Sequence, residues 1–113
     1  MITIWHNPRC SKSRQTLALL AARVDDITIR TYLDDAPTGD DIRAARDLLG
    51  CRAIDMMRTG EALFKELGLS KSDPDEVLIA AMAAHPKLIQ RPIVFANGRA
   101  ALGRPPEQVL DIL

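Results

Sequence analysis

The sequence predicts an α/β fold, a four-stranded mixed sheet flanked by helices. Two strand-like segments near the N-terminus enclose a helical pattern, and two strands joined by a tight turn lie near the C-terminus. Between these regions the apolar residues recur at helical spacing. The three patterns together indicate a sheet assembled from both halves of the chain, with a helical insert between the halves.

The N-terminal segment is typical of a β-α-β unit. Residues 2–5 predict a buried strand, Pro8 interrupts it, and a helix is expected from about Ser11. The apolar residues of this helix recur at i, i+3, i+4 and i+7: Leu17, Leu20, Ala21 and Val24. Apolar and polar residues then alternate over 27–32, which predicts a second strand, parallel to the first.

The middle third of the chain is predicted to be helical. Thr38 followed three residues later by Asp41 indicates a capping box, and Gly50 is a typical end for the helix that starts there. Two short helices are expected between residues 53 and 67. A further helix, with Pro74 as its first residue, is predicted to bury four apolar side chains: Val77, Leu78, Ala81 and Met82.

The last quarter predicts a β-hairpin and a final helix. Residues 93–96 predict a strand, Asn97-Gly98 is a strong signal for a two-residue turn, and residues 99–102 return as the antiparallel partner. Pro105-Pro106 then opens the final helix. This order of elements is the thioredoxin-like arrangement.

Length and composition favour one domain and disfavour two classes of protein. The 113 residues suffice for one core, so we expect a single thioredoxin-like domain over 1–113, with a helical insert at about 38–85. The 15 basic and 15 acidic residues give a net charge of zero, whereas nucleic-acid binders carry a positive surplus. No apolar run approaches the about 20 residues that a membrane span needs. We therefore expect no nucleic-acid partner and no membrane association.

The N-terminus and the cysteines indicate a cytoplasmic protein. The first residues lack the basic segment, long apolar run and cleavage site of a secretory leader. The two cysteines, Cys10 and Cys51, are not expected to form a structural disulfide in a reducing cytosol. A thiol that stays reduced can act as a nucleophile.

Cys10 is the strongest candidate for a catalytic residue. It lies after a predicted strand and before a predicted helix, where unpaired N–H groups and the helix dipole favour a thiolate over a thiol. Arg9, Lys12 and Arg14 add positive charge nearby, and His6 precedes them in the same loop. The alternative is a buried cysteine that acts as a small apolar residue, which the polar neighbours disfavour.

Ser13 completes a C-x-x-S pattern in which it takes the place of a second thiol. Its hydroxyl can donate to a thiolate or a bound oxyanion, or it can satisfy the backbone of the first helical turn. A single-thiol enzyme needs electrons from an outside reductant. Cys51 is expected to pack as a small residue, with a resolving thiol as the alternative. The lone His85 has no metal-ligand spacing around it, so no metal is expected.

Three arginines are candidate oxyanion ligands, because a guanidinium donates two parallel hydrogen bonds to a tetrahedral anion. Two of them precede a proline at the start of an element and the third ends a short helix: Arg91, Arg104 and Arg58. The alternative is that each is a solvated surface charge. Their spacing in the sequence does not by itself bring them together.

Three segments stand in a specific order, HNPRCSKSR at 6–14, RPIV at 91–94 and GRPPEQVLDIL at 103–113. In their order and spacing they resemble the glutaredoxin-linked arsenate reductase family. The resemblance spans essentially the whole chain. It implies a thioredoxin-like fold and an oxidoreductase that reduces arsenate to arsenite.

The resemblance also implies roles for the candidate residues. Cys10 would attack arsenic and form a cysteine-thioarsenate intermediate, and His6 would help to keep the thiolate ionised. The oxyanion would be held by three arginines: Arg58, Arg91 and Arg104. The peptide bond between Arg91 and Pro92 would be cis. Glutathione would be the reducing co-substrate, no cofactor would be bound, and glutaredoxin would be the protein partner.

Two other functions stay open. The first is a glutathione-dependent reductase of another oxyanion or of a mixed disulfide. The second is a regulator that binds RNA polymerase, since the same superfamily includes such proteins. Those regulators carry a C-x-x-C redox switch where this chain has Ser13. The serine disfavours a self-contained disulfide switch but leaves binding of a partner protein open.

Overall fold

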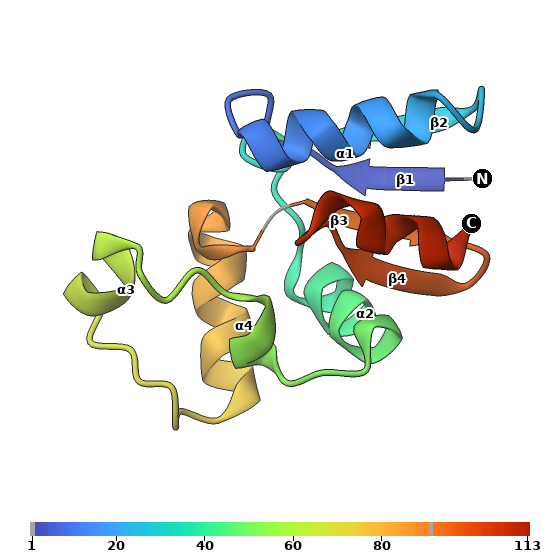
Figure 1. Ribbon diagram of the computed structural model, residues 1–113. Helices are drawn as coiled ribbons and strands as arrows, with labels where there is room; N and C mark the ends of the chain where they lie inside the picture. Colours follow the sequence, from blue (N-terminus) through green and yellow to red (C-terminus); the bar gives the residue numbers. More distant parts are fainter. Residues whose placement is uncertain (1, 91) are drawn as a thin grey trace. The chain divides into compact units, whose positions relative to one another are not determined.

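The structure, a computed structural model, describes residues 2–90 and 92–113 (Figure 1). Along the chain its elements are β1 (Ile2–Trp5), α1 (Ser11–Ala21), β2 (Ile27–Arg30), α2 (Gly39–Leu49), η1 (Ala53–Met56), α3 (Ala62–Glu66), α4 (Asp75–Ala84), η2 (Pro86–Leu88), β3 (Ile93–Ala96), β4 (Arg99–Leu102) and η3 (Pro106–Ile112). The β-α-β start, the helical middle and the hairpin followed by a helix match the predicted order of elements.

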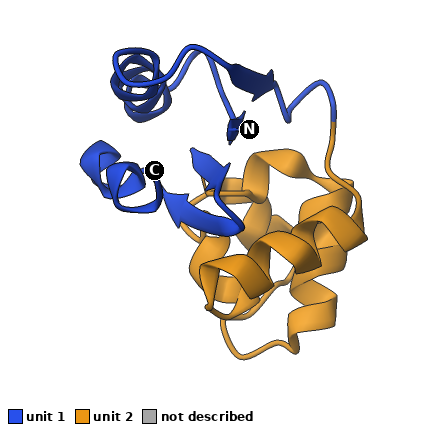
Figure 2. Ribbon diagram, turned by 90° about the vertical axis from the view of Figure 1, so that its right-hand side faces the viewer, with its two compact units in different colours: residues 1–35, 91–113 blue, residues 36–90 orange. Residues whose placement is uncertain are grey.

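The chain divides into two compact units (Figure 2). The first comprises residues 1–35 and 91–113 and contains the sheet, α1 and η3. The second comprises residues 36–90 and contains α2, α3 and α4 with the 3-10 helices η1 and η2. The insert predicted at about 38–85 lies within the second unit. A single domain over the whole chain stays a prediction.

The sheet of the first unit has the strand order β2-β1-β3-β4. β1 and β2 are parallel, with Ile4 opposite Ile29, because α1 carries the chain back to the end of the sheet where β1 begins. β3 is antiparallel to β1 and pairs with β4 through a hairpin. The prediction of a four-stranded mixed sheet is confirmed.

One face of this sheet is buried by α1 and η3, which also contact each other. Alternate strand residues and the inner faces of both helices form one apolar cluster there: Ile2, Ile4, Leu20, Val94, Ala96, Ala101, Val109 and Ile112. β1 is a central strand and supplies two of these residues. Its C-terminal end is therefore a fixed base for the loop that follows.

The hairpin between β3 and β4 turns at the two predicted residues. Asn97 has φ of 55° and Gly98 has φ of 69°, and a type I′ turn needs positive φ at both positions. The Asn97 side chain also donates from Nδ2 to the carbonyl oxygen of Ile112 at 2.9 Å. The hairpin is thereby tied to η3, so the segment between β4 and η3 is anchored on both sides.

In the second unit, α2 begins and ends where the sequence predicts. The Thr38 hydroxyl accepts from the Asp41 N–H at 3.1 Å, and the Asp41 carboxylate accepts from the Thr38 N–H at 3.0 Å. This reciprocal pair is the predicted capping box. Gly50 adopts φ of 67° and ends the helix.

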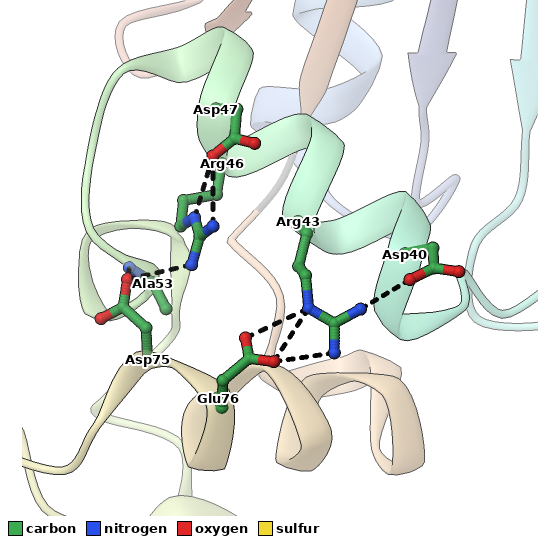
Figure 3. A network of polar contacts seen from close by, with 7 residues as sticks. All are labelled: Asp40, Arg43, Arg46, Asp47, Ala53, Asp75 and Glu76. Carbon is green, nitrogen blue, oxygen red and sulfur yellow. Dashed lines mark hydrogen bonds and ion pairs between the residues drawn. The ribbon is translucent and has the colours of Figure 1, made fainter.

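Charged side chains join α2, η1 and α4 (Figure 3). Arg43 donates from Nε to Glu76 Oε1 at 3.0 Å, and this hydrogen bond holds the pKa of Glu76 below its usual value. Arg46 donates from Nη1 to Asp75 Oδ2 at 3.3 Å, and the same oxygen accepts from the Ala53 N–H at 3.2 Å. Asp75 therefore links all three elements at the N-terminus of α4, where a negative charge is favourable.

α4 differs from the prediction at its start and in its buried face. The helix begins at Asp75, and Pro74 is the N-cap residue rather than the first helical one. Val77 is 46% exposed, and the buried residues of the helix are Leu78, Ile79 and Met82. Nearly every residue of this helix is apolar, so the spacing of apolar residues is compatible with more than one buried face. The packing of α4 against α2, η1 and η2 selects the face.

Candidate functional site

The loop after β1 is held by hydrogen bonds to β2 and within itself. The His6 N–H donates to the carbonyl oxygen of Arg30 at 2.8 Å. The Cys10 N–H donates to the carbonyl oxygen of Asn7 at 3.0 Å, and the Arg9 N–H donates to Asn7 Oδ1 at 3.0 Å. Asn7 thus closes the turn that leads into the helix, and the loop backbone fixes the position of Cys10.

Cys10 lies at the N-terminus of α1, where the sequence predicts it. It is the N-cap residue, with φ of −94° and ψ of 123°, and its carbonyl oxygen accepts from the Arg14 N–H at 3.0 Å. The residue is 8% exposed. The positive end of the helix dipole favours an anionic sulfur at this place.

The Arg104 guanidinium reaches Cys10 from the other end of the chain. Its Nη2 lies 3.9 Å from Cys10 Sγ, a hydrogen-bonding distance for sulfur. Arg104 follows β4 and forms a cis peptide bond with Pro105. The structure thereby brings together two of the predicted site residues, a nucleophile and a cation.

Gly103 permits this approach. Its N–H donates to the carbonyl oxygen of Pro92 at 2.9 Å. A Cβ at this position would lie 2.6 Å from Pro92 Cγ and 2.6 Å from Thr16 Oγ1, distances that non-bonded atoms do not adopt. Only glycine fits, and the close packing fixes the backbone from which the Arg104 side chain extends.

His6 precedes Cys10 and Ser13 follows it, and the two side chains form a buried pair. His6 Nδ1 lies 2.7 Å from Ser13 Oγ, and the Asn7 N–H donates to the same oxygen at 3.0 Å. The Ser13 hydroxyl thus joins the imidazole to the backbone of the loop. Burial, and then the charge of Arg14, lower the pKa of His6 below its usual value of 6.5. The imidazole is therefore neutral at neutral pH.

The apolar spacing of α1 did not reveal its buried hydroxyl groups. Ser13 and Thr16 are both buried, and Thr16 Oγ1 donates to the carbonyl oxygen of Lys12 at 2.8 Å. Leu20 is buried as predicted, whereas Ala21 is exposed. The available signal was helical spacing, because Ser13 and Thr16 are three residues apart and lie on the same face as Leu20.

Of the other two candidate arginines, the structure describes Arg58 only. Arg58 belongs to the second unit, where its N–H donates to the carbonyl oxygen of Leu88 at 2.8 Å. Its guanidinium donates from Nη1 to Glu61 Oε2 at 2.8 Å. Arg91, and with it the cis bond implied between Arg91 and Pro92, lies outside the described residues.

Cys51 is a free thiol in the second unit. Burial, and then the negative charges of Asp55 and Asp75, raise the pKa of Cys51 above its usual value. A protonated thiol is a poor nucleophile, so the environment of Cys51 disfavours a resolving role.

The described residues contain neither a metal-ligand cluster nor a membrane-spanning helix. Among residues 2–90 and 92–113, no group of three or more His, Cys, Asp or Glu side chains is arranged to hold a metal ion. Over the same residues, no helix combines the length and the apolar character needed to cross a bilayer.

Comparison with known proteins gives consistent matches over the full chain. The ArsC family model matches residues 5–112. An arsenate reductase of Neisseria meningitidis is 46% identical, with 99% of this chain and 97% of that protein covered. The protein YfgD of Escherichia coli, which carries no assigned activity, is 47% identical over 99% of this chain and 96% of its own. The structure of an arsenate reductase from Vibrio cholerae superposes with a TM-score of 0.95 at 49% identity, covering 99% of this chain and 97% of that chain. The predicted thioredoxin-like fold and the family resemblance are confirmed.

Proposed function

The chain belongs to the ArsC family, and from that premise we propose that it is an oxidoreductase that reduces arsenate to arsenite with Cys10 as its nucleophile. The observation that carries this proposal is the 3.9 Å contact between Arg104 Nη2 and Cys10 Sγ at the N-terminus of α1. A cation and a helix end stabilise both a thiolate and an oxyanion that approaches it.

In the first step, the Cys10 thiolate attacks the arsenic atom of dihydrogen arsenate. A sulfur–arsenic bond forms, an oxygen leaves as water after taking up a proton, and arsenic stays pentavalent in a cysteine-thioarsenate. Arg104 stabilises the negative charge on the arsenate oxygens during this step, since its guanidinium already faces the sulfur.

The family resemblance assigns two further arginines to the oxyanion, Arg58 and Arg91. In the second unit the Arg58 guanidinium is paired with Glu61 at 2.8 Å. An oxyanion at Arg58 would therefore compete with this carboxylate for the same donors. The role of Arg91 rests on the family pattern of an arginine before Pro92.

In the second step, the thiol of glutathione attacks the Cys10 sulfur. A disulfide between Cys10 and glutathione forms, the sulfur–arsenic bond breaks, and its electron pair leaves with arsenic as arsenite. Arsenic gains two electrons and the two sulfurs lose them, and the glutathione proton goes to arsenite. A glutaredoxin thiol then attacks the glutathione sulfur and releases Cys10 as a thiol. This chemistry needs reduced thiols, so we propose that the protein acts in the cytoplasm.

His6 and Ser13 would act by positioning the catalytic loop. The Ser13 hydroxyl joins His6 Nδ1 to the Asn7 N–H, and Asn7 in turn accepts from the Cys10 N–H. A neutral imidazole supplies no positive charge, so the thiolate would depend on Arg104 and the helix dipole.

One assay tests the proposed function. Purified protein is given arsenate, glutathione and glutaredoxin, with NADPH and glutathione reductase to follow disulfide formation. We expect arsenate-dependent NADPH consumption that Cys10→Ser abolishes. Turnover of a glutathionylated substrate with no response to arsenate would instead favour a thiol reductase. Capture of RNA polymerase without any turnover would favour a regulator.

A further inference from the structure

A cleft in the first unit lies against the loop that carries Cys10. Its volume is about 440 Å³, and it is lined by two short segments, residues 6–9 and residues 31–34: His6, Asn7, Pro8, Arg9, Thr31, Leu33 and Asp34. This volume falls within the about 300–1,000 Å³ typical of sites for small molecules. The mechanism above assigns no ligand to it.

Two opposite charges line the cleft. Arg9 comes from the catalytic loop and Asp34 from the turn after β2, and both residues are exposed. Among the described residues, no hydrogen bond or ion pair engages the Arg9 guanidinium or the Asp34 carboxylate. Leu33, which is 44% exposed, and Pro8 add apolar surface. A ligand with a carboxylate, an ammonium group and a short apolar stem would match this lining.

The backbone under both charges is held in place. The Arg9 N–H donates to Asn7 Oδ1 at 3.0 Å. The carbonyl oxygen of Thr31 accepts from the Asp34 N–H at 3.0 Å, which closes a turn. The two charged side chains thus extend from fixed positions, so less entropy is lost when a ligand binds.

The loop that lines the cleft leads directly into Cys10. Asn7, which lines it, accepts a hydrogen bond from the Cys10 N–H at 3.0 Å, and Arg9 is the residue before Cys10. A peptide bound along residues 6–9 would therefore lie against the loop that ends at Cys10, whose arsenic-bound sulfur it must attack.

We propose that this cleft binds the reducing co-substrate, a small zwitterionic thiol peptide such as glutathione. One carboxylate of the peptide binds Arg9, and its ammonium group binds Asp34. This inference rests on the proposed function, because the sulfur of the bound peptide performs the second step: a sulfur–sulfur bond to Cys10 forms, and the sulfur–arsenic bond breaks with its electron pair on arsenic.

Binding is tested with S-methylglutathione, which keeps the charges of the peptide but has no thiol to react. Calorimetry on the full chain should give a measurable Kd, which Asp34→Asn and Arg9→Gln each weaken by about fivefold or more, as expected for loss of one charged contact. Matched controls are Asp26→Asn and Arg23→Gln, exposed residues of the same unit that do not line the cleft. These controls should bind like the unchanged protein. No binding by the unchanged protein, or equal binding by Asp34→Asn, overturns the inference.

A second readout separates this inference from the proposed function. With arsenate as substrate, Asp34→Asn should raise the KM for glutathione and leave the KM for arsenate unchanged. Arsenate should still protect Cys10 of this variant from alkylation. Turnover with an unchanged KM for glutathione overturns the cleft assignment alone. Absence of arsenate turnover and protection in the unchanged protein overturns the proposed function, while the calorimetry still decides whether the cleft binds the peptide.

Discussion

The Arg104 guanidinium lies 3.9 Å from the Cys10 sulfur, although 94 residues separate the two in the chain. Cys10 precedes α1 and Arg104 follows β4, so the contact joins the two segments that form the first unit. Arg104 contacts the sulfur directly as a cation, whereas His6, whose pKa is lowered by burial, is neutral at neutral pH.

Replacement of Arg104 by Gln should lower kcat/KM for arsenate by about 100- to 1,000-fold, the usual cost of losing one donor to a developing oxyanion. It should also slow alkylation of Cys10 by iodoacetamide at pH 7, because the thiolate loses its neighbouring cation. Arg99→Gln, at an exposed position of β4, is the control and should change neither rate. An unchanged alkylation rate in Arg104→Gln would refute the role given to this contact.

Replacement of Gly103 by Ala should destabilise the protein and impair its activity together. The added Cβ would lie 2.6 Å from both Pro92 Cγ and Thr16 Oγ1, and such overpacking costs about 1–3 kcal/mol. The midpoint of urea unfolding and the arsenate kinetics measure the two effects. Gly60→Ala is the matched control, because nothing lies within 4 Å of a Cβ there. Equal unfolding midpoints for the two variants would contradict the close packing at Gly103.

Stability should fall on mild acidification because of His6. Its pKa in the folded protein is below the usual 6.5, so the unfolded chain binds the proton more tightly and protonation favours unfolding. The stabilising contribution of the neutral ring is complete above pH 6.5 and decreases as the pH falls through the lower folded value. Urea unfolding between about pH 5 and 8 should show this slope, and His6→Gln should reduce it. His85→Gln in the second unit should retain the slope. Loss of the slope in His85→Gln, with the slope unchanged in His6→Gln, would contradict the assignment to His6.

The two cysteines should differ sharply in function. Cys10→Ser should abolish arsenate turnover, whereas Cys51→Ser should keep it within about twofold, since burial and nearby carboxylates raise the pKa of Cys51. The NADPH-coupled rate measures both variants, and mass spectrometry of the enzyme after one turnover locates the glutathione adduct. An adduct on Cys51, or comparable loss of activity in both variants, would point to a two-thiol mechanism.

The elements that local chemistry determines were predictable from the sequence. The Asn97-Gly98 turn follows from the positive φ that its two positions need, and the start of α2 follows from the side chains of Thr38 and Asp41. The position of Cys10 at a helix N-terminus follows in the same way, from a strand, a loop with Pro8 and a helical pattern.

Other features depend on contacts between distant segments, and spacing did not reveal them. Ser13 and Thr16 continue the buried face of α1. The contacts that bury them come from His6 and Gly103, which the spacing within α1 does not identify. Val77 is exposed because the packing of α4 selects another of its apolar faces. The pairing of Arg104 with the thiol could be proposed from the family resemblance, but composition and periodicity do not contain it.

Arg104 follows the β3–β4 hairpin, so it is synthesised long after Cys10. Until β3 and β4 join β1, a nascent chain has the cysteine but not the guanidinium that contacts it. Reactivity of the sulfur is thereby coupled to completion of the sheet. A chain that ends before Gly103 would lack this cation beside its thiol.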